Sequence, residues 1–236
     1  MKFAVIAAGE GSRLAREGIK RHKPLVRLNG EPMLDRLIRI FIAQGASEIV
    51  LIVNEHMRDV VEYARKMEYE FRNSPCRLRL VVKTTPGSMY SFFEISCYLE
   101  KQPFCLTTVD TVFRELDFAD YISAFSTSEA DGLMAVTDYV DDEKPLYVAT
   151  DADMNITGFY DEDSDCRYIS GGVYCLKPET IDVLRNSIES GQNRMRDFQR
   201  QLIKDGLHLK AYRFPKIIDV DHAGDIGKAE SFLQEN

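Results

Sequence analysis

Residues 1–30 read MKFAVIAAGEGSRLAREGIKRHKPLVRLNG. The run Lys2–Ala8 is apolar and is typical of a buried strand. Gly9 and Gly11 follow at once, where the chain would leave the carboxyl end of that strand. Glycines at such a place let backbone N–H groups approach a phosphate or a base closely. The stretch therefore predicts a ligand-binding turn at the edge of an α/β sheet.

The segment after the glycine pair is basic, although the chain as a whole has a formal net charge of -8. Glu17 is its one carboxylate. Proteins that bind nucleic acids usually present a basic surface. A local basic segment in an acidic chain instead indicates a small anionic ligand. Its cations are Arg13, Arg16, Lys20, Arg21, Lys23 and Arg27.

The composition is that of an ordinary soluble globular protein: 236 residues, 44% hydrophobic and 29% charged. The sequence has no apolar run of about 18 residues, so no membrane span is predicted. The N-terminal run lacks a signal-peptide pattern, which favours the cytoplasm. The five cysteines show no metal-binding spacing, and three lie in apolar runs, so buried free thiols are expected.

Strand-like and helix-like patterns alternate with short connections, which predicts an α/β fold with a mainly parallel sheet. The second half is richer in strands, and one domain is predicted over 1–236. The expected strands are Lys2–Ala8, Glu48–Val53, Leu78–Lys83, Phe104–Val109, Gly132–Tyr139, Tyr147–Thr150, Ile156–Tyr160, Tyr168–Leu176 and Leu207–Phe214. The expected helices are Pro32–Gln44, His56–Phe71, Ser88–Leu99, Pro178–Ser190, Arg194–Lys204 and Ala223–Gln234.

The glycine pair has more than one interpretation. A dinucleotide fingerprint, G-x-G-x-x-G, would need glycine where Leu14 stands, and the following residues look more like a long loop than a helix start. A P-loop is excluded, because no G-K-[ST] follows at the right distance. A glycine-rich turn without a ligand is the third interpretation.

The stretches AAGEGSRL (7–14) and KPLVRLNGEPML (23–34) resemble a signature of the nucleotidyltransferase family that makes nucleotide sugars. That signature is G-x-G-x-R-L, then K-P-L, then G-x-P-(M/L)-L. His22 stands where the family usually has proline. The resemblance covers nearly the whole chain and implies a three-layer, Rossmann-like, mostly parallel mixed sheet flanked by helices. It also implies a nucleotide-binding half, 1–113, and an acceptor-binding half, 114–236.

The resemblance assigns roles to individual residues. Arg13 and Lys23 would contact the phosphates as catalytic groups. Asp110, at the end of LTTVD, and Asp221, in KIIDVDHAGD, would bind Mg²⁺, and Asp219 matches a less fixed acidic position. The nucleotide would be bound by Ala7, Ala8, Gly9, Gly11, Ser12, Gly87 and Ser88. The acceptor would lie against Asp110, Ser170, Gly171 and Gly172.

Structural interpretations of the same residues stay open. Asp110 would cap the segment that follows it, and Asp221 would be the N-cap of the helix from Ala223. The segment around Ser170 would be a core strand without a ligand. Ser170 and Gly171 stand where the family usually has Asn and Ala.

The implied reaction joins an NTP to a phosphorylated acceptor and releases pyrophosphate. It needs positioned cations rather than a general base, because a phosphate monoester is mostly dianionic at pH 7. A sugar 1-phosphate is the expected acceptor, and phosphocholine or another phosphoalcohol is the alternative. A possible homodimer is expected, with neither a nucleic-acid nor a membrane partner. A non-catalytic nucleotide-binding module and an NAD-binding oxidoreductase are alternatives of other classes. A D-x-D glycosyltransferase is disfavoured, because Asp110 begins D-T-V.

Overall fold

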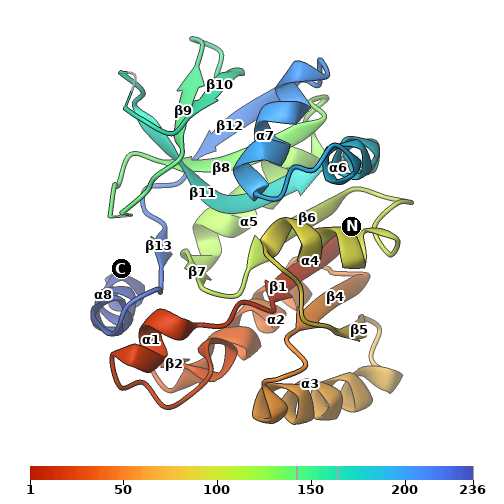
Figure 1. Ribbon diagram of the computed structural model, residues 1–236, viewed down its shortest axis with the longest axis vertical. Coiled ribbons are helices and arrows are strands. Elements are labelled where there is room, and N and C mark those ends of the chain that lie inside the picture. The colour runs from red at the N-terminus through yellow and green to blue at the C-terminus, as the bar shows by residue number, and fades with distance from the viewer. Residues whose placement is uncertain (142, 164, 236) are drawn as a thin grey trace.

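The computed structural model describes residues 1–141, 143–163 and 165–235. Within them, nine strands form one mixed sheet in the order β10-β9-β11-β6-β1-β4-β5, and β8 and β12 extend it beside β11 (Figure 1). The strands are β1 (Lys2–Ala7), β4 (Glu48–Val53), β5 (Arg77–Val82), β6 (Phe104–Thr108), β8 (Gly132–Thr137), β9 (Tyr147–Thr150), β10 (Ile156–Tyr160), β11 (Tyr168–Leu176) and β12 (Leu209–Arg213).

The first part of the sheet is parallel and the second part is mixed. β1 pairs in parallel with both β4 and β6, and β4 pairs in parallel with β5. β11 runs antiparallel to β6, β8 and β9, whereas β12 is parallel to β8. Because β11 pairs directly with β6, the strands of 1–113 and of 114–236 belong to the same sheet. The mostly parallel mixed α/β sheet predicted from the sequence is confirmed.

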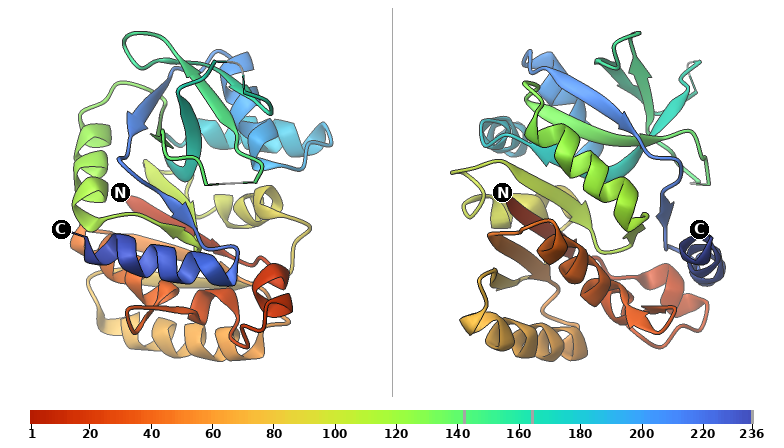
Figure 2. Two further views of the ribbon diagram at one scale, coloured as in Figure 1. Left: turned by 90° about the vertical axis from the view of Figure 1, so that its left-hand side faces the viewer. Right: turned by 180° about the vertical axis from the view of Figure 1, so that it is seen from behind.

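Helices cover both faces of this sheet (Figure 2). Core residues of α2, α3 and α5 belong to one hydrophobic cluster, and those of α4, α6 and α7 belong to a second cluster. The helices are α1 (Ser12–Arg16), α2 (Met33–Ala43), α3 (Arg58–Glu70), α4 (Ser88–Ser96), α5 (Glu115–Ser126), α6 (Thr180–Glu189), α7 (Met195–Lys204) and α8 (Ala223–Gln234).

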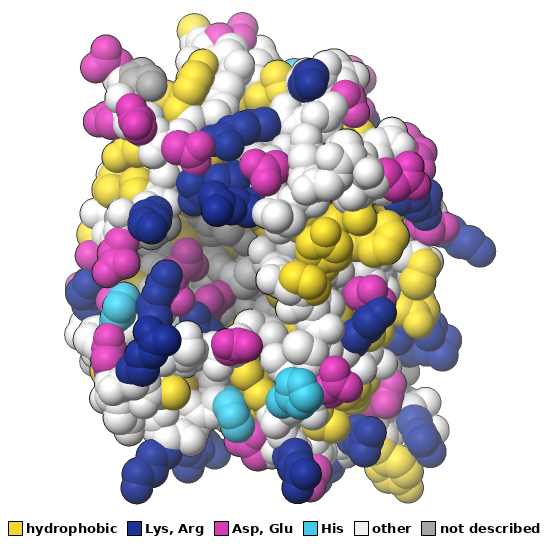
Figure 3. Space-filling view, viewed as in Figure 1, with side chains coloured by type: hydrophobic (Ala, Val, Ile, Leu, Met, Phe, Trp, Pro, Cys, Tyr) yellow, Lys and Arg dark blue, Asp and Glu magenta, His cyan; other side chains and the backbone are white. Residues whose placement is uncertain are grey.

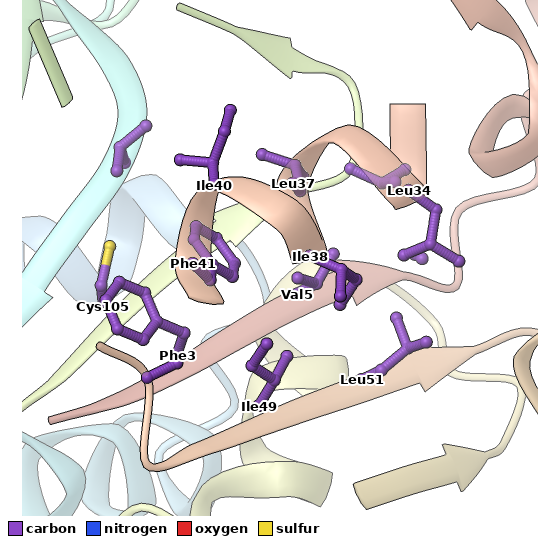
Figure 4. Packing of buried hydrophobic residues seen from close by; sticks show 14 of the residues in the cluster. Phe3, Val5, Leu34, Leu37, Ile38, Ile40, Phe41, Ile49, Leu51 and Cys105 are labelled. Carbon is purple, nitrogen blue, oxygen red and sulfur yellow. The ribbon is translucent and has the colours of Figure 1, made fainter. Parts of the chain in front are cut away.

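Alternation along β1 explains why both faces are buried. Phe3 and Val5 pack under α2, whereas Ala4 and Ile6 belong to the cluster on the opposite face. Figure 4 shows Phe3 beneath Phe41 of α2, and their ring centroids are 4.6 Å apart. A strand buried on both sides reads as a continuous apolar run, as residues 2–8 do. This strand carries the glycine pair at its carboxyl end.

Two helices differ from the sequence-based expectation. Ser12–Arg16 was expected to be loop, but it forms α1, which begins after Gly11 at φ 61° and is anchored by buried Leu14. Glu115–Ser126 was given no element, but it forms α5. The apolar spacing of α5 would have indicated a helix, since Phe118, Tyr121, Ile122 and Phe125 are buried. Of the other expected elements, each forms with its ends shifted by a few residues at most.

The C-terminal segment returns to the N-terminal one. β13 (Ile218–Asp219) pairs antiparallel with β7 (Thr111–Val112), directly after Asp110. β2 (Arg27–Leu28) and β3 (Glu31–Pro32) form a short hairpin. Phe232 of α8 belongs to one hydrophobic cluster with Leu28 of this hairpin and with Met33, the first residue of α2. Figures 1 and 2 show α8 beside this N-terminal segment. The return brings residues 110 and 221 to one place.

The five cysteines are free, and Cys76, Cys105 and Cys175 are buried, as expected. In the described part of the chain, no helix is both long and apolar enough to cross a membrane.

Candidate functional site

The residues predicted from the sequence converge at the carboxyl ends of β1 and β6. Figure 3 shows that the face in this view is hollowed, with carboxylates inside the hollow and lysine or arginine side chains around it. Two neighbouring hollows meet here. One encloses about 310 Å³ and includes Asp110 and Lys23 in its lining, whereas the other encloses about 390 Å³ and includes Arg13 and Asp221.

The first hollow is built by three loops that follow strands. Its walls are mainly backbone and small side chains, so a planar base and phosphates can approach the main chain. Thr85 and Pro86 also line it, although they were not predicted from the sequence. The selected residues that line it are Ala7, Ala8, Gly9, Gly11, Lys23, Gly87, Ser88 and Asp110.

Buried Asn54 supports the wall of this hollow through hydrogen bonds. Its Nδ2 donates to the carbonyl oxygen of Ala8 at 3.2 Å, and its Oδ1 accepts from Thr84 Oγ1 at 2.9 Å. Asn54 directly follows β4. A buried polar side chain at the end of a central strand is a signal that the sequence analysis missed, since such a group must be hydrogen-bonded. It ties the glycine loop to the loop before α4.

Lys23 joins the two hollows. Its Nζ donates to Asp110 Oδ2 at 2.7 Å and to Asp221 Oδ1 at 2.6 Å. Arg13 Nη1 donates to Asp221 Oδ2 at 2.6 Å. Two cations and two carboxylates thus form one ion-paired cluster, although Arg13 and Asp221 are 208 residues apart in the sequence. We call Arg13, Lys23, Asp110 and Asp221 the charge cluster.

The Lys23 ammonium is fixed in its charged form. Burial by itself would lower the pKa of Lys23, but Asp110 and Asp221 outweigh burial and raise it above the ordinary 10.5. The Lys23 side chain is 11% exposed and that of Asp110 is 19% exposed, whereas Arg13 is 53% exposed. Lys23 is therefore the buried cation of the cluster, and Arg13 is the exposed one.

The two carboxylates fit a divalent cation. Asp110 Oδ1 is buried and has no hydrogen-bond partner among the described residues. Leaving a buried carboxylate oxygen unpaired is costly unless it meets a cation. No group of three or more His, Cys, Asp and Glu side chains in the described ranges could hold a metal. Mg²⁺ commonly takes one or two carboxylates and completes its shell with phosphate and water oxygens.

The capping interpretations of Asp110 and Asp221 are wrong. The carboxylates of both residues accept from Lys23. The N-cap of α8 is His222, and Asp225 completes its capping box. Asp225 Oδ2 accepts from the backbone N–H of His222 at 2.8 Å. Asp221 is thereby left to face the site.

Glu17 clamps the basic segment onto α8. Its Oε1 lies 2.6 Å from His222 Nδ1, and its Oε2 accepts from the backbone N–H of Ala223 at 2.6 Å. The bond from Ala223 and that from His222 lower the pKa of Glu17. The hydrogen bond to Glu17 raises the pKa of His222 above 6.5. The lone carboxylate of the basic segment thus fixes Arg13 and Lys23 relative to Asp221.

The clamp predicts a pH window. Because the pKa of His222 is raised, its contribution to the free energy of unfolding is complete below pH 6.5. That contribution is lost as the pH rises through the folded-state pKa. Because the pKa of Glu17 is lowered, its contribution to the free energy of unfolding is complete above pH 4.5. That contribution is lost as the pH falls through the folded-state pKa. In metal-free protein, an NMR titration of His222 should have its midpoint above 6.5, and Glu17→Gln should lower that midpoint. An unchanged midpoint in Glu17→Gln would contradict the clamp.

The second hollow lies between the ends of β8 and β11 and the start of α8. Ser170 and Gly171 line it, as the resemblance implies for the acceptor. Five carboxylates and two cations of the described residues line it: Asp141, Glu143, Asp219, Asp221 and Asp225 with Arg13 and Lys228. Thr137 and Tyr139 add hydroxyl groups. Tyr139, Asp141, Glu143 and Lys228 were missed from sequence, because they lie in a loop and on a distant helix.

Two of the site residues predicted from the sequence, Ser12 and Gly172, are not among the described residues that line the two hollows. Ser12 is the first residue of α1. Gly172 has φ 71°, and a Cβ there would lie 3.3 Å from Thr111 Oγ1. Gly172 thus serves the bend of β11 against β7, whereas its neighbour Gly171 faces the hollow.

Gly171 is required by close packing. A Cβ there would overlap Ile217 Cδ1 and would lie 3.3 Å from the carbonyl oxygen of Ala135. We expect Gly171→Ala to lower the free energy of unfolding by about 1–3 kcal/mol, the usual cost of overpacking. Chemical denaturation measures the change. Gly227→Ala is the control, since it adds a methyl in open space on α8 and should stabilise the protein.

A third hollow, of about 590 Å³, adjoins the first one across Pro86, Gly87 and Ser88. Arg194 and Arg196 line its far wall, at the start of α7. Arg196 also ion-pairs with Asp161, which fixes it to the end of β10. These arginines were not predicted from the sequence, because the start of α7 carries no motif.

The sequence model of the family described as "Nucleotidyl transferase" matches residues 2–236. A mannose-1-phosphate guanyltransferase of Schizosaccharomyces pombe is 27% identical over 187 residues, which are 77% of this chain and 51% of that protein. A probable glucose-1-phosphate cytidylyltransferase of Bacillus subtilis is 24% identical over 235 residues, which are 90% of this chain and 88% of that protein. The chain therefore spans about half the length of the first relative and most of the second.

The fold also matches solved structures. The inositol-1-phosphate CTP transferase from T. maritima superposes with a TM-score of 0.80 at 21% identity, covering 100% of this chain and 96% of that chain. At this identity the likeness establishes the fold. It agrees with the three-layer, nucleotide-diphospho-sugar transferase type of sheet predicted from the sequence.

Proposed function

Because the chain belongs to the nucleotidyl transferase family, we propose that it transfers a nucleoside monophosphate from an NTP to a phosphorylated small molecule. Sugar 1-phosphates are the leading acceptor class, and pyrophosphate is the second product. One observation carries the proposal: the charge cluster lies where a glycine-walled hollow meets a polar one. An α-phosphorus held at that junction is reachable from both sides.

The reaction requires positioning more than proton transfer. The acceptor phosphate is the nucleophile and is already mostly dianionic at neutral pH. The backbone near Gly9 and Gly11 binds the nucleotide, while Lys23 and Arg13 neutralise phosphate oxygens. Holding both substrates in line with these cations removes the repulsion between two anions. No side chain needs to act as a general base.

Asp110 and Asp221 would hold Mg²⁺. The ion would supply positive charge that draws electron density from the phosphate oxygens. Its support here is the pair of convergent carboxylates and the unpartnered Asp110 Oδ1. The expectations of a cytoplasmic location and of a homodimer stay predictions from the sequence.

Aminoalcohol phosphates, such as phosphocholine, are the second acceptor class. They are favoured by the five carboxylates of the second hollow, which outnumber its basic side chains Arg13, Lys228 and His222. An ammonium group on the acceptor would offset this negative charge, whereas a sugar would offer hydroxyls to the same oxygens. The same walls thus allow two kinds of acceptor, which a direct comparison separates.

The first test is a thermal-shift screen with ATP, CTP, GTP, UTP, dTTP and NAD, each with and without Mg²⁺. A ligand that binds only the folded protein raises the melting temperature by mass action. We expect a Mg²⁺-dependent rise with one or two NTPs. That NTP is then assayed for pyrophosphate release with glucose 1-phosphate, mannose 1-phosphate and phosphocholine. A rise with NAD alone would favour an oxidoreductase and contradict the proposal.

A further inference from the structure

In the nucleotide-free protein, Lys23 lies between the two carboxylates that would bind the divalent ion. Its Nζ contacts one oxygen of each carboxylate, at 2.7 Å from Asp110 Oδ2 and 2.6 Å from Asp221 Oδ1. Asp221 Oδ2 accepts from Arg13. Of the four carboxylate oxygens, Asp110 Oδ1 alone has no hydrogen-bond partner among the described residues. The protein's own cations therefore take up three of the four oxygens.

A divalent ion on the same carboxylates would compete with Lys23. Mg²⁺ lies about 2.1 Å from its oxygen ligands. An ion and an ammonium bound to the same carboxylate oxygen would lie no more than about 5 Å apart, where like charges repel strongly at a poorly solvated site. Lys23 is 11% exposed, so water screens this repulsion little. The two cations favour separate positions.

The stem of Lys23 lies where a second anion would bind. A Cβ on Gly11 would meet Lys23 Cβ at 3.4 Å, so the lysine stem packs directly beneath the glycine loop. Lys23 lines the same hollow as Gly9 and Gly11. Rotation about the side-chain bonds alone would carry the ammonium from the carboxylates to phosphates bound at that loop. A triphosphate thus offers the partner that Lys23 needs before it leaves Asp110 and Asp221.

We propose that Lys23 holds the position of the divalent ion in the nucleotide-free protein and moves to the triphosphate when the nucleotide binds. The inference rests on the proposed function, and it adds an order of events. The protein by itself binds the divalent ion weakly, and nucleotide and metal promote each other's binding. Such coupling is reciprocal by thermodynamic necessity. Lys23 is then a positioning residue for the metal as well as a phosphate ligand.

The test is a titration of nucleotide-free protein with Mn²⁺, in which the EPR signal reports unbound Mn²⁺. Wild-type protein should bind Mn²⁺ weakly, and Lys23→Met should bind it roughly tenfold or more tightly, because the competing charge is gone. Lys20→Met removes a charge from an exposed lysine of the same segment and should leave the affinity unchanged. Adding Asp110→Asn to Lys23→Met should abolish the gain.

Equal Mn²⁺ affinities of wild type and Lys23→Met would overturn the proposal, and so would an equal gain in Lys20→Met. A second measurement uses wild-type protein, whose folding is not in question. The side-chain ¹⁵N signal of Lys23 should be unmoved by Mg²⁺ alone and should shift with Mg²⁺ plus inorganic triphosphate. A full shift with Mg²⁺ alone would also overturn it.

These readouts are separate from catalysis. Tight Mn²⁺ binding by wild-type protein that still transfers nucleotide would refute the inference and leave the proposed function standing. If the Mn²⁺ affinities follow the predicted pattern but no acceptor receives a nucleotide, the proposed function would be refuted and the competition between Lys23 and the divalent ion would stand.

Discussion

Asp110→Asn should lower the turnover number by about 10³-fold, the scale of losing one positioned electrostatic group in an active site. The neutral amide keeps the size of the side chain but no longer offers a buried anion to a divalent cation. The contact to Lys23 survives as a hydrogen bond to the amide oxygen, so the melting temperature should change by a few degrees at most. Pyrophosphate release and differential scanning calorimetry measure the two effects.

Asp120→Asn is the matched control for this prediction. Asp120 is an exposed carboxylate of α5, the helix that closely follows Asp110. The control should retain wild-type turnover. Wild-type turnover by Asp110→Asn itself would remove Asp110 from the reaction and with it the proposed metal site.

Lys23→Ala should weaken NTP binding by about 10- to 100-fold, the value of a charge-assisted hydrogen bond to phosphate. The lysine is the buried cation of the charge cluster, and the exposed Arg13 alone cannot replace it. Lys23→Arg keeps the charge and should restore part of the affinity. Calorimetric titration with the NTP selected by thermal shift gives the dissociation constants.

Lys101→Ala is the control, because Lys101 is exposed in the turn before β6, at the opposite edge of the sheet from the site. Its NTP affinity should equal that of the wild type. An NTP affinity of Lys23→Ala that also equals the wild-type value would show that Lys23 does not contact the triphosphate.

The parts of the site that the sequence predicted share one physical signature. Gly9, Gly11 and Asp110 directly follow apolar strand runs, and the carboxyl ends of neighbouring parallel strands meet at one edge of a sheet. Local patterning is enough to find such residues. Lys23 was selected as a cation of the basic segment. Asp221 was found through the resemblance, since it does not lie at the end of a strand of the main sheet.

The parts that the sequence did not predict depend on long-range packing. Asp221 reaches Asp110 because β13 pairs with β7, and two strands of two residues each leave no readable pattern. Tyr139, Asp141 and Lys228 meet only because α8 crosses to the loop after β8. The helix α5 is different in kind. The apolar spacing of α5 is regular, so the sequence was sufficient to predict this helix.

The most direct measurement follows the label from an [α-³²P]NTP. The protein is incubated with Mg²⁺, the NTP selected by thermal shift and each candidate acceptor, and the products are separated by chromatography. Transfer of the α-phosphorus to a phosphorylated acceptor, with one pyrophosphate released per transfer, is the predicted result. Label that stays in NTP with every sugar 1-phosphate and aminoalcohol phosphate, although the NTP binds, would contradict the account and favour a protein that binds nucleotide without catalysis.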